Sequence, residues 1–171
     1  MTELSRISLS GMQDRVHDPL HDPMSLAFEE ARAAAARGEV PIGAVVVRDG
    51  EILGRGGNRT RMDNDPTAHA EIVALRMACE AAASERLPGC DLYVTLEPCP
   101  MCAAAVSFAR IRRLYYAAED IKGGAVDNGV RFYHAPTCHH APEVYGGLRA
   151  AESATLLRDF FRAKRTEDDL F

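Results

Sequence analysis

Apolar positions along the chain change their spacing several times, and each change marks a new element. From Met24 onward they recur with helical spacing until Gly38, which favours a helix that ends at this glycine. Residues 42–47 form a continuous apolar run rich in β-branched residues, Asp49-Gly50 has the composition of a tight turn, and residues 51–56 form the returning strand. The first third of the chain therefore predicts a helix followed by a β-hairpin.

Further helices and strands alternate along the rest of the chain. One helical pattern begins at residues 67–71, and two others cover residues 98–110 and 151–165. Strand patterns cover residues 91–96 and 113–117. Residues 121–142 have no clear period and contain several Gly and Pro, which is typical of a functional loop. This order of elements predicts an α/β protein with a mixed sheet and helices on both faces.

Length and end composition suggest how the chain is divided. Its 171 residues suit a single domain, which we place at residues 24–165. Residues 1–23 contain Asp-Pro steps that oppose a helix and are expected to form a loosely ordered arm, and residues 166–171 an acidic tail. Neither a membrane span nor an apolar leader is apparent, so we expect a cytoplasmic protein with no membrane partner.

The charge of the chain gives an ambiguous indication of its partners. A net charge of −5 argues at first against a nucleic acid, because phosphate binding depends on a positive field. Basic residues nevertheless gather at 110–113 and 158–165. These groups are either local basic patches or ordinary solvated helix faces.

Two short motifs contain the residues that point to chemistry. They are His69-Ala70-Glu71 and Pro98-Cys99-Pro100-Met101-Cys102, and each stands at the head of a predicted helix. Cys99 and Cys102 project from one face of a first helical turn, where the helix dipole favours thiolates. With His69 they make a zinc ligand set that leaves a fourth position for water, as in catalytic rather than structural sites.

Glu71 is expected to be the general base of this site. Since His69 and Glu71 stand two residues apart at a helix start, one can hold the metal while the other faces its water. The carboxylate can accept a proton from water and later deliver one to departing ammonia.

A closed structural zinc site is the alternative for these cysteines. It requires a fourth ligand, for which Cys79, Cys90, Cys138 and His139 are available. Cys79 and Cys90 fit better as core thiols. Cys138-His139-His140 could hold a second metal, an interpretation that we do not favour.

The combination H-x-E followed by P-C-x-x-C is the signature of zinc-dependent nucleobase deaminases. The chain resembles the cytidine deaminase superfamily and, within it, the bacterial tRNA-specific adenosine deaminases. The resemblance covers about residues 24–165 and is carried by the segments 39–45, 58–59, 65–71, 92–99 and 159–162.

The resemblance implies a three-layer α/β/α fold, a homodimer, one zinc ion per chain and deamination of a flipped-out wobble adenosine. It also implies roles for residues outside the zinc motifs. Asn58 would hold the purine edge, the backbone at Ala70 and Pro98 would line the base pocket, and Asp120 would lie near the ribose. The last helix, including Phe161 and Arg162, would touch the tRNA anticodon loop.

Two other functions compete with the deamination of a tRNA. Relatives with the same zinc motifs act on small purines, so a deaminase of a free base or nucleoside such as guanine is one alternative. A catalytically silent, zinc-containing RNA-binding subunit is the other, and the presence of Glu71 argues against it.

Overall fold

The computed structural model describes residues 22–168, with side chains as far as residue 166. The helices are α2 (Pro23–Ala36), α3 (Ala70–Ala82), α4 (Pro100–Phe108), the 3-10 helix η2 (Phe132–His134) and α5 (Ala150–Asp168). The strands are β1 (Gly43–Arg48), β2 (Glu51–Gly57), β3 (Asp91–Leu96), β4 (Arg113–Ala118) and β5 (Glu143–Tyr145). Because residues 1–21 and 169–171 lie outside the described part, the division into arm, domain and tail stays a prediction.

Two helices extend slightly beyond residues 24–165. Asp22 caps α2, since its carboxylate accepts a hydrogen bond from the Ser25 backbone N–H at 3.0 Å. Pro23 then occupies the first helical turn, where its missing N–H costs nothing. The Asp22-Pro23 step therefore starts a helix. At the other end α5 continues to Asp168 and includes the first residues of the predicted tail.

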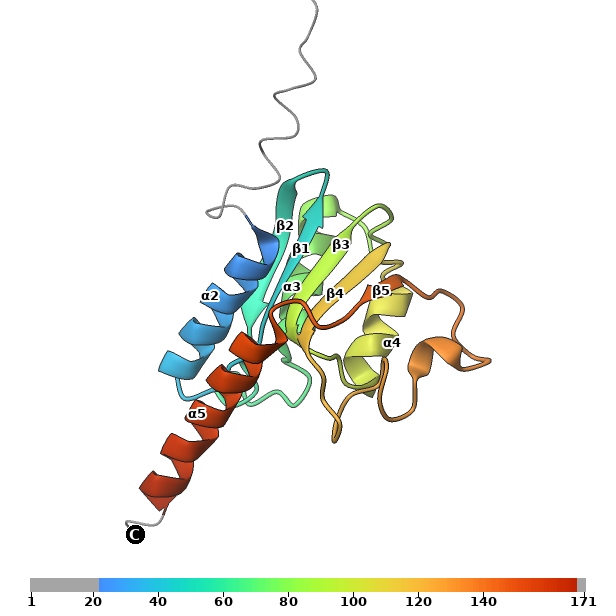
Figure 1. Ribbon diagram of the computed structural model, residues 1–171. Coiled ribbons are helices and arrows are strands. Elements are labelled where there is room, and N and C mark those ends of the chain that lie inside the picture. The colour runs from blue at the N-terminus through green and yellow to red at the C-terminus, as the bar shows by residue number, and fades with distance from the viewer. Residues whose placement is uncertain (1–21, 169–171) are drawn as a thin grey trace, which may run out of the picture.

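The five strands form one mixed sheet in the order β2-β1-β3-β4-β5 (Figure 1). β1 pairs antiparallel with both β2 and β3, whereas β3–β4 and β4–β5 are parallel. Asp49 and Gly50, both with positive φ, form the predicted turn between β1 and β2. β5 is not among the strands predicted from sequence, because three residues between Pro142 and Gly146 have no recognisable alternation.

Helices cover both faces of the sheet and make three layers (Figure 1). Along β1, Ala44 and Val46 belong to the core shared with α3 and α4. Val45 and Val47 belong to the core shared with α2, against which Leu156 of α5 also packs. The apolar run of β1 is continuous because both of its faces are buried. The predicted α/β/α fold with a mixed sheet is confirmed.

Close packing of α3 on β2 depends on a glycine. A Cβ added at Gly54 would lie 2.3 Å from the carbonyl oxygen of Ala74 and 2.7 Å from the nitrogen of Ala78. Both are backbone atoms of α3 and cannot turn away. The absence of a side chain at Gly54 therefore sets the distance between α3 and the sheet.

The chain enters α3 and α4 from the same end of the sheet. β2 leads through Asn58 and a loop to His69, and β3 leads through Glu97 and Pro98 to Cys99. The hydrogen bond from the Arg59 N–H to the Ala68 carbonyl, 3.0 Å long, closes the loop before α3. Within residues 22–168, no helix combines the length and apolar character needed to cross a membrane.

Candidate active site

The three predicted zinc ligands converge where α3 and α4 begin. His69 and Cys99 are the N-cap residues of α3 and α4, and Cys102 follows in the first turn of α4. The Nδ1 atom of His69 lies 3.6 Å from the Sγ atom of Cys99 and 3.6 Å from that of Cys102. Tetrahedral zinc, with bonds of about 2.3 Å to sulfur and about 2.0–2.1 Å to nitrogen, separates such donors by about 3.6 Å. The donor set therefore fits this metal.

The protonation of the two thiols also suits a cation. Hydrogen bonds from the Cys102 thiol and from His69 lower the pKa of Cys99 to about 4. The pKa of Cys102 is raised by the hydrogen bond that its thiol makes to Cys99 and by burial. The negative charge on the Cys99 sulfur thus opposes ionisation of the Cys102 thiol. A divalent ion among the three donors would stabilise both as thiolates.

Glu71 lies beside this donor set but is not part of it. Among the described residues, the only group of three or more side chains whose donor atoms could hold a metal is His69, Cys99 and Cys102. Glu71 is only 4% exposed, and desolvation raises its pKa to about 7, with a further contribution from the charge of Cys99. A carboxyl group with a pKa near neutrality can both accept and release protons.

Asn58, Ala70 and Pro98 flank the donors. The side-chain oxygen of the buried Asn58 accepts a hydrogen bond from the Ala70 N–H at 3.2 Å. The Pro98 carbonyl accepts a hydrogen bond from the Ala125 N–H at 2.9 Å. The structure thus brings the three residues to the helix starts, and their contacts with a substrate stay predictions.

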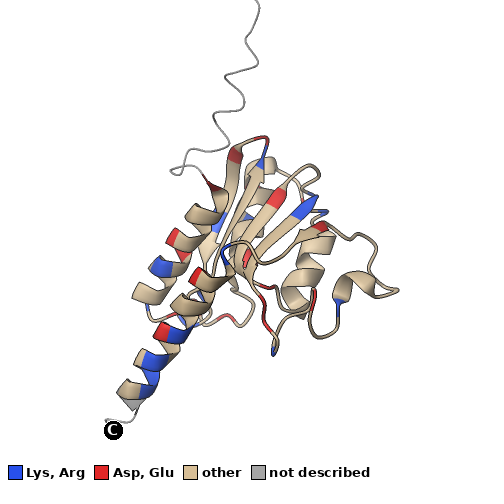
Figure 2. Ribbon diagram, in the orientation of Figure 1, with Lys and Arg blue, Asp and Glu red and all other residues tan. Residues whose placement is uncertain are grey.

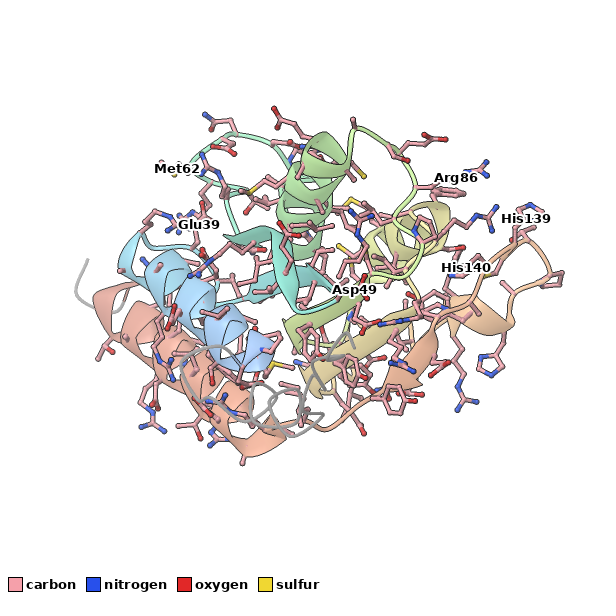
Figure 3. All side chains as sticks on the ribbon, turned by 90° about the horizontal axis from the view of Figure 1, so that it is seen from above. Glu39, Asp49, Met62, Arg86, His139 and His140 are labelled. Carbon is pink, nitrogen blue, oxygen red and sulfur yellow. The ribbon has the colours of Figure 1, made fainter. Side chains whose placement is uncertain are left out.

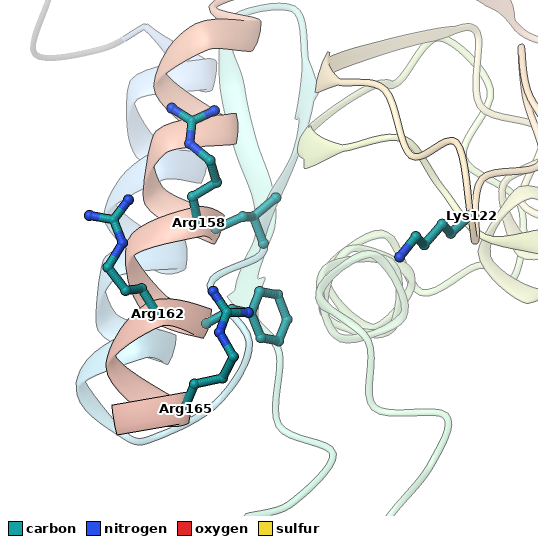
Figure 4. A pocket seen from close by; sticks show the side chains of 6 residues that line it. Lys122, Arg158, Arg162 and Arg165 are labelled. Carbon is teal, nitrogen blue, oxygen red and sulfur yellow. The ribbon is translucent and has the colours of Figure 1, made fainter. Parts of the chain in front are cut away.

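Asp120, Phe161 and Arg162 lie on two elements that face a common cavity. The Asp120 carboxylate accepts hydrogen bonds from the backbone of Lys122 and Gly123 and closes a tight turn. Phe161 is 44% exposed, and its ring contacts Phe160 edge-on. A cavity of about 420 Å³ lies between this turn and α5. It is lined by Lys122, Leu157, Arg158, Phe161, Arg162 and Arg165 (Figure 4). We call it the α5 cavity.

A buried glutamate that the sequence did not single out organises the loop after β4. Glu97 is 2% exposed, and its carboxylate accepts hydrogen bonds from the backbone N–H groups of Asp120 and residues 126–128 and from the Asn128 side chain. Burial opposes its ionisation, but these donors outweigh burial and lower the pKa of Glu97. The carboxylate therefore connects the zinc motif to the turn that contains Asp120.

A second buried glutamate has the same function on the other side of the site. Glu39 is 1% exposed and accepts hydrogen bonds from the backbone N–H groups of Arg61 and Met62 and from the Thr60 hydroxyl. It holds the loop that separates Asn58 from His69. No local signal separates Glu39 or Glu97 from an exposed glutamate, because the groups that they bind are far away in sequence.

The remaining cysteines do not add a ligand. The Cys138 thiol contacts the Ser107 hydroxyl at 3.6 Å and the His140 carbonyl at 3.2 Å, and the His140 ring contacts the Ile111 carbonyl at 2.7 Å. These contacts anchor the loop to α4. Figure 3 shows His139 and His140 on the opposite side of the molecule from Glu39. Cys90 is buried and Cys79 is partly buried, and burial raises the pKa of both thiols.

The chain is similar to known deaminases over most of its length. It is 69% identical over 145 residues to a tRNA-specific adenosine deaminase of Agrobacterium fabrum, a match that covers 85% of this chain and 95% of that protein. It also superposes with a TM-score of 0.78, at 69% identity, on a structure from studies of A-to-I editing by tRNA:A34 deaminases, covering 79% of this chain and 98% of that one. A guanine deaminase from Bacillus subtilis superposes with a TM-score of 0.55 at 35% identity, covering 66% of this chain and 83% of that one.

The fold, the two helix starts and the His-Cys-Cys donors beside a glutamate define a class of hydrolytic deaminases, the cytidine deaminase superfamily. Within it, the chain belongs to the MafB19-like deaminase family, whose model matches residues 20–165.

Proposed function

We propose that this chain catalyses the zinc-dependent hydrolytic deamination of adenosine to inosine at the wobble position of a tRNA anticodon. The observation that carries the proposal is the buried Glu71 beside three converging metal donors. The high identity to a tRNA-specific adenosine deaminase supports the substrate.

His69, Cys99 and Cys102 would hold one zinc ion per chain. Bound there, zinc supplies a Lewis acid that lowers the pKa of a water molecule to about 7. Three protein ligands leave one coordination position for that water. The 3.6 Å spacing from His69 to each sulfur supports this ligand set.

Glu71 moves the protons of the reaction. It accepts a proton from the attacking water and transfers it to the neighbouring ring nitrogen of adenine. It then takes the second proton from the hydroxyl group now on carbon 6 and delivers it to the amino group as the bond from carbon 6 to nitrogen breaks, so that water and adenosine become inosine and ammonia. Its burial keeps its pKa close to neutrality, which suits both directions of transfer.

The other predicted site residues position the nucleotide. Asn58 holds the purine edge, Ala70 and Pro98 line the base pocket through their backbone, and Asp120 lies near the ribose. Phe161 and Arg162 contact the anticodon loop. Figure 2 shows basic residues gathered on the half of α5 nearer the C-terminus, where they line the α5 cavity. Splayed bases of RNA loops are commonly recognised by aromatic and basic side chains of this kind.

A homodimer and a cytoplasmic location complete the proposal. Phe108 of α4 is 71% exposed and offers an apolar surface that another chain can cover. A second copy of the chain would cover it. The proposed tRNA substrate supports a cytoplasmic location.

The test is a comparison of substrates with the purified, zinc-loaded protein. We expect ammonia and inosine from an anticodon stem-loop with adenosine at the wobble position, and little turnover of free guanine, adenosine or cytidine. A Glu71→Gln protein should bind the stem-loop and zinc without turnover. Turnover of guanine alone would instead assign the activity of the Bacillus subtilis relative, and stem-loop binding without any turnover would indicate a silent RNA-binding subunit.

A further inference from the structure

A second basic groove lies beside α5 and shares no lining residue with the α5 cavity. It has a volume of about 490 Å³ and is lined by Arg37, Gly38, Glu39, Arg61, Met62 and Lys164. Arg37 and Gly38 follow α2, Arg61 and Met62 belong to the loop between Asn58 and His69, and Lys164 lies on α5. Figure 3 shows Glu39 and Met62 on this side of the molecule. We call this surface the Arg37–Arg61 groove.

The carboxylate that lines the groove is already bound. Glu39 is almost fully buried, and the backbone N–H groups of Arg61 and Met62 lie 3.0 and 2.8 Å from one of its oxygens. The Thr60 hydroxyl is 3.3 Å from the other oxygen. The negative charge is therefore directed at the loop backbone, and the accessible side chains of the groove are predominantly cationic.

Arg37 and Arg61 are exposed, and both contact main-chain oxygens. Within the described part of the chain each donates a hydrogen bond only to a backbone carbonyl, of Asn58 and Gly38 respectively, at 3.4 Å. Neither forms an ion pair there, whereas Arg59 in the same loop binds both oxygens of Asp63. Asp63 is close enough for Arg37 to contribute to lowering its pKa, but its oxygens are already bound by Arg59. The two guanidinium groups can therefore bind an anion without breaking an ion pair.

The groove is directly connected to the active site. Arg37 contacts the carbonyl of Asn58, whose side chain binds the first N–H group of α3 beside His69 and Glu71. The α5 cavity, which shares no lining residue with the groove, presents Lys122 and three arginines (Figure 4). Two cationic surfaces thus adjoin the C-terminal half of α5. A polyanionic strand that lies along this part of α5 would contact both, whereas a free purine has no phosphate for either.

We propose that the Arg37–Arg61 groove binds a backbone phosphate of the substrate RNA, at a surface separate from the α5 cavity. This inference rests on the proposed function, because it assumes that the substrate is an RNA strand. It adds a contact outside the base pocket that determines affinity rather than the choice of base.

The test reverses the charge of both arginines and measures salt dependence. We expect an Arg37→Glu/Arg61→Glu protein to bind the wobble-adenosine stem-loop at least about tenfold more weakly and to lose roughly 0.7 from the log-log salt slope, the contribution of one phosphate contact on a single strand. Zinc content should not change. An Arg37→Gln/Arg61→Gln protein should show the same trend more weakly, and it replaces the double glutamate variant if that variant does not fold.

Arg48→Glu/Arg110→Glu is the matched control, since it changes the net charge equally. Arg48 ends β1 and Arg110 follows α4, both at the end of the sheet where β3 begins, opposite the site. We expect wild-type-like binding and salt slope from the control. An unchanged salt slope in the folded Arg37/Arg61 variants, or an equal loss in the control, would overturn the groove proposal. The proposed function fails separately, if the wild-type protein does not deaminate the stem-loop.

Discussion

Replacing Glu97 with glutamine should destabilise the protein far more than the same replacement at Glu39. One oxygen of Glu97 accepts hydrogen bonds from the backbone N–H groups of residues 126–128, at 3.1, 2.9 and 2.9 Å. The other accepts from the Asp120 N–H at 2.9 Å and from the Asn128 side chain at 2.7 Å. Glutamine keeps one oxygen and places an NH₂ group at the second position.

The consequence at Glu97 follows from which donors can turn. The Asn128 amide can rotate and present its oxygen, but the Asp120 N–H cannot. One buried donor is then left without an acceptor, at a cost of about 1–3 kcal/mol, and the three remaining hydrogen bonds lose their charged acceptor. Removing a buried charge offsets part of this loss. We expect the free energy of unfolding to fall by about 3 kcal/mol.

Glu39 provides the matched comparison. Its glutamine variant keeps one oxygen for the N–H groups of Arg61 and Met62, and the new NH₂ group meets the Thr60 hydroxyl, which can act as an acceptor. No backbone donor is left unpaired. The expected loss is therefore about 1 kcal/mol.

Urea unfolding of the zinc-loaded proteins, followed by circular dichroism, measures both values. Stem-loop deamination under the same conditions should fall more for Glu97→Gln, because the turn that contains Asp120 loses its anchor. Equal destabilisation by the two substitutions, or a Glu97→Gln protein as stable as wild type, would refute the argument from unpaired donors.

Three further predictions concern the metal, the base and the packing of α3. Cys102→Ala should lose most of the bound zinc while Cys138→Ala keeps it, as metal analysis will show; undiminished zinc in the former would contradict the ligand set. Glu71→Gln should keep fold and zinc but lose about 10²-fold or more in deamination rate, and activity within a few-fold of wild type would mean that another group moves the proton. Gly54→Ala should lower the free energy of unfolding by about 2 kcal/mol or more, since its Cβ would meet α3 backbone atoms; unchanged thermal stability would show that α3 can shift.

The sequence alone determined the elements that depend on local patterning. The β-branched run of β1, the Asp49-Gly50 turn and the helical spacing of α2 each involve residues close together in the chain, so their preferences are visible in the sequence. The zinc donors were predicted for the same reason. The pattern consists of two cysteines three residues apart at one helix start and a histidine at another, and it is typical of metal ligands. The structure brings all three residues together.

Tertiary structure alone decided the features that depend on distant segments. The three residues of β5 form a strand because β4 offers unpaired backbone groups at its edge, not because of their own sequence. Glu97 binds groups 23 to 31 residues away. The Arg37–Arg61 groove brings together the end of α2, a loop and α5. Such contacts exist only after the sheet has placed these segments side by side, because periodicity and propensity describe neighbours along the chain and not neighbours in space.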